Sequence, residues 1–257
     1  MGSMKGVRQQ KPGVRESGQV AVESAIVLPL FVFLILGTLQ LGLMHQARLV
    51  TKYAAYKAVR AGSLNNAQKS VMEKAALAVM LPLVSRDAGG GEYIKTINNA
   101  TEFHNKWTWM GVKANSMPDT GLPYVEVTIC GPSTKEVSGT ELDFDDPRQA
   151  ASKEWKLDHR TKLRIQLTFN YRMPIPFANW VIHAAAFNRE IPWLMRMGEK
   201  ASKGTPNFGP QQSKYISAAD KGIYVLPIRA AYTMRMQSNV FVKDMPSSNK
   251  CRTTNRY

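Results

Sequence analysis

The longest apolar segment of the chain lies close to its N-terminus. Residues 24–47 contain no formally charged side chain, and residues 25–44 are apolar almost throughout. A helix of about 20 such residues is about 30 Å long, which matches the hydrocarbon core of a membrane. The run is longer than the apolar region of a secretory signal peptide, and no small-x-small cleavage site follows it. The pattern therefore predicts one membrane-spanning helix, bent at Pro29.

The same helix is expected to continue beyond the membrane as a stalk. No Gly or Pro lies between Gly42 and Gly62 and alanine is frequent there, so we expect the helix to end near Leu64. A second helix is expected over residues 66–84, where apolar side chains recur every three or four positions. Three glycines at 89–91 follow without a Lys-Ser/Thr pair, which indicates a hinge and not a phosphate-binding loop.

Three later segments have the composition of β-strands. They cover residues 124–130, 162–171 and 223–237. In the second segment apolar and polar residues alternate from Leu163 onward, which is typical of an antiparallel strand with one buried and one exposed face. A helix is expected over residues 177–197, where the chain enters through two prolines.

These elements predict an α+β fold in four parts. Residues 1–18 form a basic leader, and residues 19–64 form the transmembrane and stalk helix. Residues 65–246 form an exported domain with an antiparallel sheet of about three or four strands and packed helices. Within it, residues 198–213 have the composition of a polar linker. Residues 247–257 are expected to form a flexible tail.

Basic residues outnumber acidic ones, with 34 Lys and Arg against 19 Asp and Glu and a formal charge of +15. This charge predicts attraction to anionic surfaces such as lipid headgroups. The chain has neither a zinc-finger spacing nor an RNA-binding strand motif, so we expect no nucleic-acid partner. Basic residues flank the apolar run almost equally on both sides, so they do not fix its orientation. We expect a cytoplasmic N-terminus, because the leader is short and the folded part follows the run.

No motif in the sequence indicates catalysis or a metal site. The acidic stretch 141–146 lacks the glycine of an EF-hand, and Pro147 occupies the position of the next ligand. We interpret this stretch as a solvated loop or a docking patch. No HExxH motif or nucleophile arrangement accompanies the histidines, which are His45, His104, His159 and His183. We therefore expect a protein that is not an enzyme, with no cofactor, no metal and no small-molecule substrate.

The two cysteines, Cys130 and Cys251, form no CxxC or Cys/His ligand pattern, which excludes zinc and thioredoxin-type chemistry. Two interpretations remain. In a domain outside the cytoplasm the pair would form a disulfide that ties the C-terminal tail to a strand. Otherwise they are two thiols, one buried and one in a loose tail.

A single carboxylate, Glu23, directly precedes the uncharged run. Placing a charge against an apolar helix in a membrane carries a desolvation cost. One explanation is that Glu23 lies at the headgroup level, where it interacts favourably with the helix dipole. The residues around it indicate another.

The segment 15–29 resembles the N-terminus of type IV pilin precursors, and specifically the TadE-like pseudopilins of tight-adherence systems. The shared features are a basic leader, Gly18, an apolar helix with Glu23 five residues later, and then Leu28 and Pro29. The resemblance extends over residues 15–63. A late strand that ends in Thr-Met-Arg at 233–235 is also similar.

This resemblance implies that a prepilin peptidase cleaves between Gly18 and Gln19 on the cytoplasmic side. It implies that Glu23 aligns subunits by pairing with the free amine of a neighbour. The implied partners are other pilin-like subunits and the pilus assembly platform. The implied location is the inner membrane, with a single span, a periplasmic domain and possible incorporation into an extracellular filament.

The chain is longer than many members of that family, which argues against the role of major subunit. We therefore expect a minor subunit that primes or caps a tight-adherence pilus or a related secretion filament. The alternative is an unprocessed bitopic inner-membrane scaffold or adaptor with a periplasmic protein-binding domain.

Overall fold

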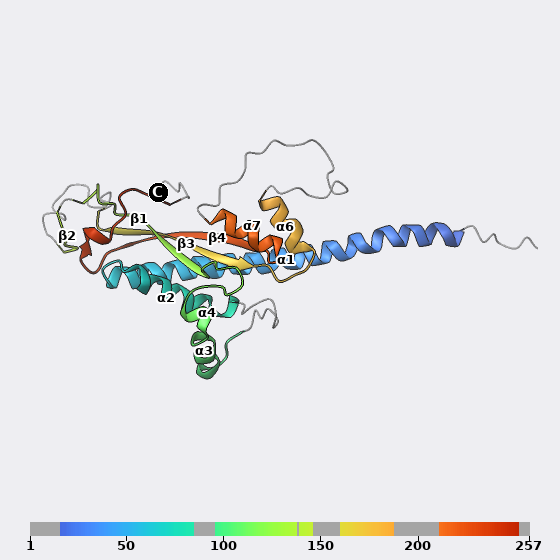
Figure 1. The fold of residues 1–257 in the computed structure, drawn as a ribbon, viewed down its shortest axis with the longest axis horizontal. Helices are drawn as coiled ribbons and strands as arrows, with labels where there is room; N and C mark the ends of the chain where they lie inside the picture. The colour runs from blue at the N-terminus through green and yellow to red at the C-terminus, as the bar shows by residue number, and fades with distance from the viewer. Residues whose placement is uncertain (1–15, 85–95, 138, 146–159, 188–210, 252–257) are drawn as a thin grey trace, which may run out of the picture.

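A long N-terminal helix organises the whole protein. The computed structural model describes residues 16–84, 96–137, 139–145, 160–187 and 211–251. Helix α1 (Glu16–Leu64) is 49 residues long and ends at the residue expected from the sequence. Its N-terminal part projects away from the other elements, whereas its C-terminal part lies along them (Figure 1).

The remaining elements form a mixture of helices and antiparallel strands. In chain order they are α2 (Lys69–Met80), η1 (Leu81–Leu83), α3 (Ala100–Trp107), α4 (Met110–Lys113), β1 (Val125–Gly131), β2 (Glu141–Leu142), β3 (Lys162–Arg172), α6 (Ala178–Ala186), α7 (Gln212–Asp220), β4 (Val225–Arg235), β5 (Val240–Phe241) and η3 (Val242–Asp244). The predicted α+β fold, with a long N-terminal helix before an antiparallel sheet, is confirmed.

The main sheet has three antiparallel strands in the order β1-β3-β4. Its register places Thr168 of the central strand β3 between Glu126 of β1 and Arg229 of β4. The two-residue strands β2 and β5 form a separate antiparallel pair. The three main strands correspond to the three predicted segments, and the small pair was not predicted.

The hydrophobic core lies between α1, α2 and one face of the main sheet. Alternate side chains of β3 point into it, and each is at most 1% exposed: Leu163, Ile165, Leu167, Phe169 and Tyr171. Small side chains of α1 meet them and are fully buried: Ala47, Ala54, Ala55 and Ala58. Because these residues are small, the helix axis can lie close to the sheet.

The prediction that β3 has one exposed face is wrong. Its polar residues are also buried, at 1–8% exposure: Gln166, Thr168, Asn170 and Arg172. β3 is the central strand, and hydrogen-bonding partners from other elements cover its second face. Asn170 accepts a hydrogen bond from the Tyr215 hydroxyl at 2.6 Å. Arg172 donates to Asp119 at 2.6 Å. The alternation therefore marks two chemically different buried faces.

Two predicted helices differ in length from the observed ones. The helix expected over 66–84 begins at Lys69 and changes at Leu81 into a 3₁₀ turn, because Pro82 cannot donate an α-helical hydrogen bond. The helix expected from residue 177 begins at Ala178, and the described part ends at Ala186. The glycines 89–91 and residues 198–210 of the predicted linker lie outside the described residues. Helix α7 begins at Gln212, within the last part of that linker.

Gly62 is expected to be the least tolerant glycine of α1. A Cβ atom at this position would lie 2.5 Å from Met72 Sδ and 2.9 Å from Leu163 Cδ2. We expect Gly62→Ala to lower the free energy of unfolding by about 1–2 kcal/mol, because overpacking outweighs the better helix propensity of alanine. Urea unfolding of the detergent-solubilised protein measures this. The matched control is Gly42→Ala in the same helix, where nothing lies within 4 Å of the new methyl group and no loss is expected.

Candidate functional site

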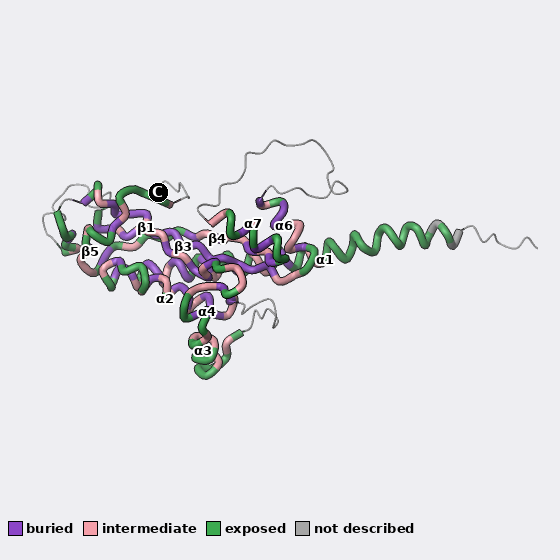
Figure 2. Tube along the Cα trace, viewed as in Figure 1, coloured by how far each residue is buried: buried purple, intermediate pink, exposed green. Residues whose placement is uncertain are grey.

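The first part of α1 exposes a continuous apolar surface. Every described side chain from Val20 to Ile35 is exposed, and several large ones exceed 60% exposure, among them Ile26, Leu28 and Leu30. Figure 2 shows this part of the helix as fully exposed, in contrast to its other end. Soluble proteins rarely expose so large an apolar surface. Among the described residues, one helical segment, Val20–Leu64, is long and apolar enough to cross a membrane.

The exposed part of α1 ends at Gln40, where the domain begins to cover the helix. Gln40 is fully buried, and its Oε1 accepts a hydrogen bond from the backbone N–H of Ile175 at 3.1 Å. Residues 20–39 therefore remain uncovered, and 20 helical residues are about 30 Å long. This length equals the thickness of the hydrocarbon core. The apolar run in the sequence extends further, to Ala47, because its last part is buried against the domain.

The predicted processing and assembly residues lie together at the start of this exposed segment. Gly18 and Glu23 are both exposed on α1, and nothing lies within 4 Å of a Cβ atom at Gly18. Gln19 belongs to the same helix, and its side chain is outside the described part. The helix begins at Glu16, so the last three residues of the predicted leader are helical. The basic residues of the leader lie outside the described residues.

The two cysteines are joined in the structure. Cys130 at the end of β1 and Cys251 form a disulfide with a Cα–Cα distance of 5.3 Å across 121 residues of sequence. The bond holds the C-terminal segment beside the sheet, where Cys251 Sγ lies 3.8 Å from the carbonyl oxygen of Thr128.

An ion pair lies close to this disulfide in sequence. Arg164 Nη2 donates to both carboxylate oxygens of Glu136, at 2.9 and 3.0 Å, and Ser133 N–H donates to the same carboxylate at 2.8 Å. Burial raises the pKa of Glu136, but the hydrogen bonds from Ser133 and Arg164 and the charge of Arg164 outweigh it, so the pKa lies below its ordinary value of 4.5. The pair connects the loop after β1 to the central strand.

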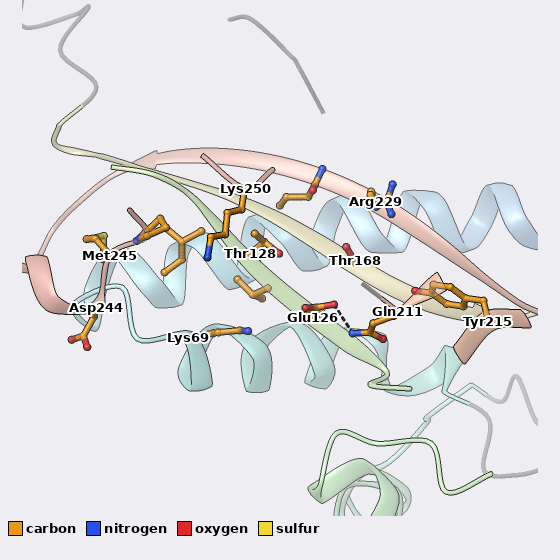
Figure 3. A pocket seen from close by; sticks show the side chains of 14 residues that line it. Lys69, Glu126, Thr128, Thr168, Gln211, Tyr215, Arg229, Asp244, Met245 and Lys250 are labelled. Atoms are coloured by element: carbon orange, nitrogen blue, oxygen red, sulfur yellow. Dashed lines mark hydrogen bonds between the residues drawn. The ribbon is translucent and has the colours of Figure 1, made fainter. Parts of the chain in front are cut away.

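A polar pocket of about 490 Å³ lies over the second face of the sheet (Figure 3). All three strands contribute to it through Glu126, Thr168 and Arg229, and Lys250 reaches it from the C-terminal segment. Gln211 Nε2 donates to Glu126 Oε2 at 3.1 Å. Within the part of the chain that the structure describes, no group of three or more His, Cys, Asp or Glu side chains is placed to hold a metal ion.

The remaining candidate residues are scattered over the molecule. Glu141, at the start of the acidic stretch, lies in strand β2 and accepts a hydrogen bond from Asn239 at 2.8 Å, so the stretch is only partly a loop. Asp146 and His159 lie outside the described residues. His183 is buried in α6 and stacks on Phe187 at 4.3 Å between ring centroids, which is a packing role.

Together these features describe an α+β protein whose N-terminal helix has the length and composition of a single membrane span. Residues 18–60 match the family model of TadE-like proteins. This match confirms the resemblance expected from the sequence, and it covers Gly18, Glu23 and the part of α1 that packs on the sheet. It indicates a protein related to the tight-adherence pilus, from a family that is structural and not enzymatic. No curated protein and no solved structure matches the chain.

Proposed function

We propose that this protein is a minor pilin-like subunit that acts in the assembly, priming or capping of a tight-adherence pilus or related secretion filament. The observation that carries the proposal is the uncovered apolar segment of α1, with Gly18 and Glu23 at its start. Such a segment needs an apolar environment along its whole length. The bilayer provides one before assembly, and neighbouring apolar helices provide one within a filament.

Cleavage between Gly18 and Gln19 would create the second charge that assembly needs. The new α-amine at Gln19 would lie four residues before Glu23, which is about one helical turn or 6 Å along the axis. In an apolar helix bundle, opposite charges attract strongly and a charge without a partner is costly. Pairing Glu23 of one subunit with the amine of the next would therefore fix the stagger between neighbouring helices.

The part of the chain beyond the family match supports a specialised role. The match ends at residue 60, whereas the sheet, the pocket and the disulfide all follow it. We infer that this domain contacts other pilin-like subunits or the assembly platform, and that it limits the protein to a minor position.

The proposed orientation has a cytoplasmic N-terminus and a periplasmic domain. The Cys130–Cys251 disulfide supports it, because such bonds persist in oxidising compartments and are rare in the cytoplasm. Protease treatment of spheroplasts, with the inner membrane intact, is expected to digest the domain and spare the short leader.

The proposal requires a mature chain that begins at Gln19. Intact-mass measurement of the membrane-extracted protein, from cells that contain a prepilin peptidase, is expected to show the loss of residues 1–18. Gly18→Leu should abolish this cleavage, because a side chain would occupy the scissile position. Gly37→Leu is the matched control, since Gly37 lies on the same helix with nothing within 4 Å of an added Cβ, and it should be processed normally.

One observation favours the alternative, an unprocessed bitopic scaffold or adaptor. The Gly18–Gln19 bond lies inside α1, where regular helix geometry protects it from a peptidase unless the first turn opens. Uncut protein as the sole species in peptidase-containing cells would favour the scaffold and contradict the pilin-like role.

A further inference from the structure

The connection between β3 and α6 has an unusual backbone. Phe177 has φ 63° and ψ −53°, and the N–H of Ala178 donates to the carbonyl oxygen of Pro176 at 2.8 Å. This combination is a γ-turn with positive φ, which is rare and strained for a residue with a side chain. Pro174 and Pro176 restrict the chain just before it. The turn is therefore rigid, and it holds Phe177 in one orientation.

The side chain of Phe177 points away from the protein. It is 68% exposed, although phenylalanine is costly to expose to water. Trp180, in the first turn of α6, is half-exposed beside it in sequence. A strained turn that presents an apolar ring to the outside indicates a binding role, because packing within the domain does not account for it.

The position of the turn identifies what it would meet. Ile175, two residues before Phe177, donates its N–H to Gln40, the residue at which the uncovered part of α1 ends. Figure 1 shows the β3–α6 connection at the end of the domain from which the free part of α1 emerges. If residues 20–39 occupy the hydrocarbon core, this turn lies at the membrane surface.

We propose that the turn at residues 174–177 is a membrane-surface anchor whose Phe177 side chain inserts among the lipids of the leaflet from which α1 emerges. The proposal rests on the membrane span of the proposed function. Aromatic side chains are enriched at this level of the bilayer, and interfacial segments insert about 5–10 Å to the boundary between headgroups and acyl chains. The first basic residue after the span, Arg48, lies about 12 Å beyond Gln40 along α1, within reach of anionic headgroups.

Such an anchor would fix the tilt of the domain. A single helix leaves the domain free to rotate and tilt over the membrane, whereas a second contact beside α1 holds it in one pose. Before assembly, every subunit would then present the same face of its domain to its partners.

The test uses the full-length protein in vesicles of phosphatidylethanolamine and phosphatidylglycerol that contain nitroxide-labelled lipid. Phe177→Cys carries a fluorescent label, with the native disulfide kept intact. Quenching by nitroxides near the headgroup is expected to reduce its fluorescence about twofold, because the site would lie within 5–10 Å of that level. Phe241→Cys is the matched control, a 37% exposed phenylalanine on β5 near the opposite end of the domain, and it should not be quenched.

A third label separates this inference from the span itself. Leu30→Cys, in the middle of the uncovered segment, should be quenched by nitroxides deep in the acyl region. Quenching at Leu30, with Phe177 behaving like Phe241, would overturn the anchor and leave the span intact. No quenching at Leu30 would overturn both.

Two further outcomes bear on the anchor. A label at 177 that is shielded in assembled filaments but never quenched by lipid would assign the turn to contact with a neighbouring subunit and overturn the proposal. If Phe177→Cys disturbs the γ-turn, a label at the neighbouring exposed position Pro176→Cys tests the same level of the membrane. Quenching there supports the anchor, and its absence overturns it.

Discussion

Glu23→Ala is expected to reduce the amount of assembled filament by at least about tenfold while cleavage at Gly18–Gln19 continues. Loss of the carboxylate would leave the amine at Gln19 of the neighbouring subunit without its proposed partner in an apolar bundle. A loss of about 1.4 kcal/mol per contact already changes an association constant tenfold. The cost of an unmatched charge in a low-dielectric environment is at least of that size. Immunoblots of sheared filament and membrane fractions measure the ratio.

Two variants show whether the charge itself is responsible. Glu23→Gln keeps the shape and removes the charge, so it should fail almost as completely as alanine, whereas Glu23→Asp should keep part of the activity. Thr38→Ala is the control on the same exposed segment, since the Thr38 hydroxyl bonds only locally, to the carbonyl oxygen of Ile35 at 2.8 Å. Filaments of Glu23→Ala at wild-type levels would show that Glu23 has no pairing role.

The parts of the fold that could be predicted are those whose signals are long and local. Helix α1 follows from an uninterrupted apolar and alanine-rich sequence, and β3 follows from its strict alternation. The burial of both faces of β3 could not be predicted, because Asp119 and Tyr215, which partner its polar side chains, are far away in sequence. Two-residue strands such as β2 and β5 carry no periodicity.

Helix α3 was missed although a signal for it was present. The side chain of Asn99 accepts the N–H of Glu102 at 2.8 Å, and Glu102 accepts the N–H of Asn98 at 3.0 Å. This reciprocal arrangement resembles a capping box, and its Asn-x-x-Glu spacing is visible in the sequence. The helix itself is short and has no buried side chain, so no apolar periodicity accompanies the cap.

The candidate site shows the same division. Gly18, Gln19 and Glu23 were found because their pattern fits within one short segment. The polar pocket was not found, because it combines three strands with the C-terminal segment. The turn at Phe177 was missed as well, since a positive φ at phenylalanine has no sequence signal. The cysteines left two interpretations open, because 121 residues of separation do not determine a distance.

Removal of the Cys130–Cys251 disulfide is expected to lower the free energy of unfolding of the domain by about 2–5 kcal/mol. The bond spans 121 residues, so it removes much chain entropy from the unfolded state. Few other contacts tie down the segment it holds. One is the hydrogen bond from Thr134 N–H to the carbonyl oxygen of Pro246, at 3.0 Å. Urea unfolding of the detergent-solubilised double variant Cys130→Ser, Cys251→Ser, beside the wild type, measures the loss.

A reductant supplies the control and extends the argument to the compartment. It should destabilise the wild type to the level of the double variant and leave that variant unchanged. Equal unfolding midpoints for all samples would show that the bond adds nothing. In intact cells, a periplasmic domain should contain no alkylatable thiol until it is reduced, because the oxidising compartment maintains the bond. Alkylation of both cysteines without reduction would contradict the proposed orientation, since it would place the domain in a reducing compartment.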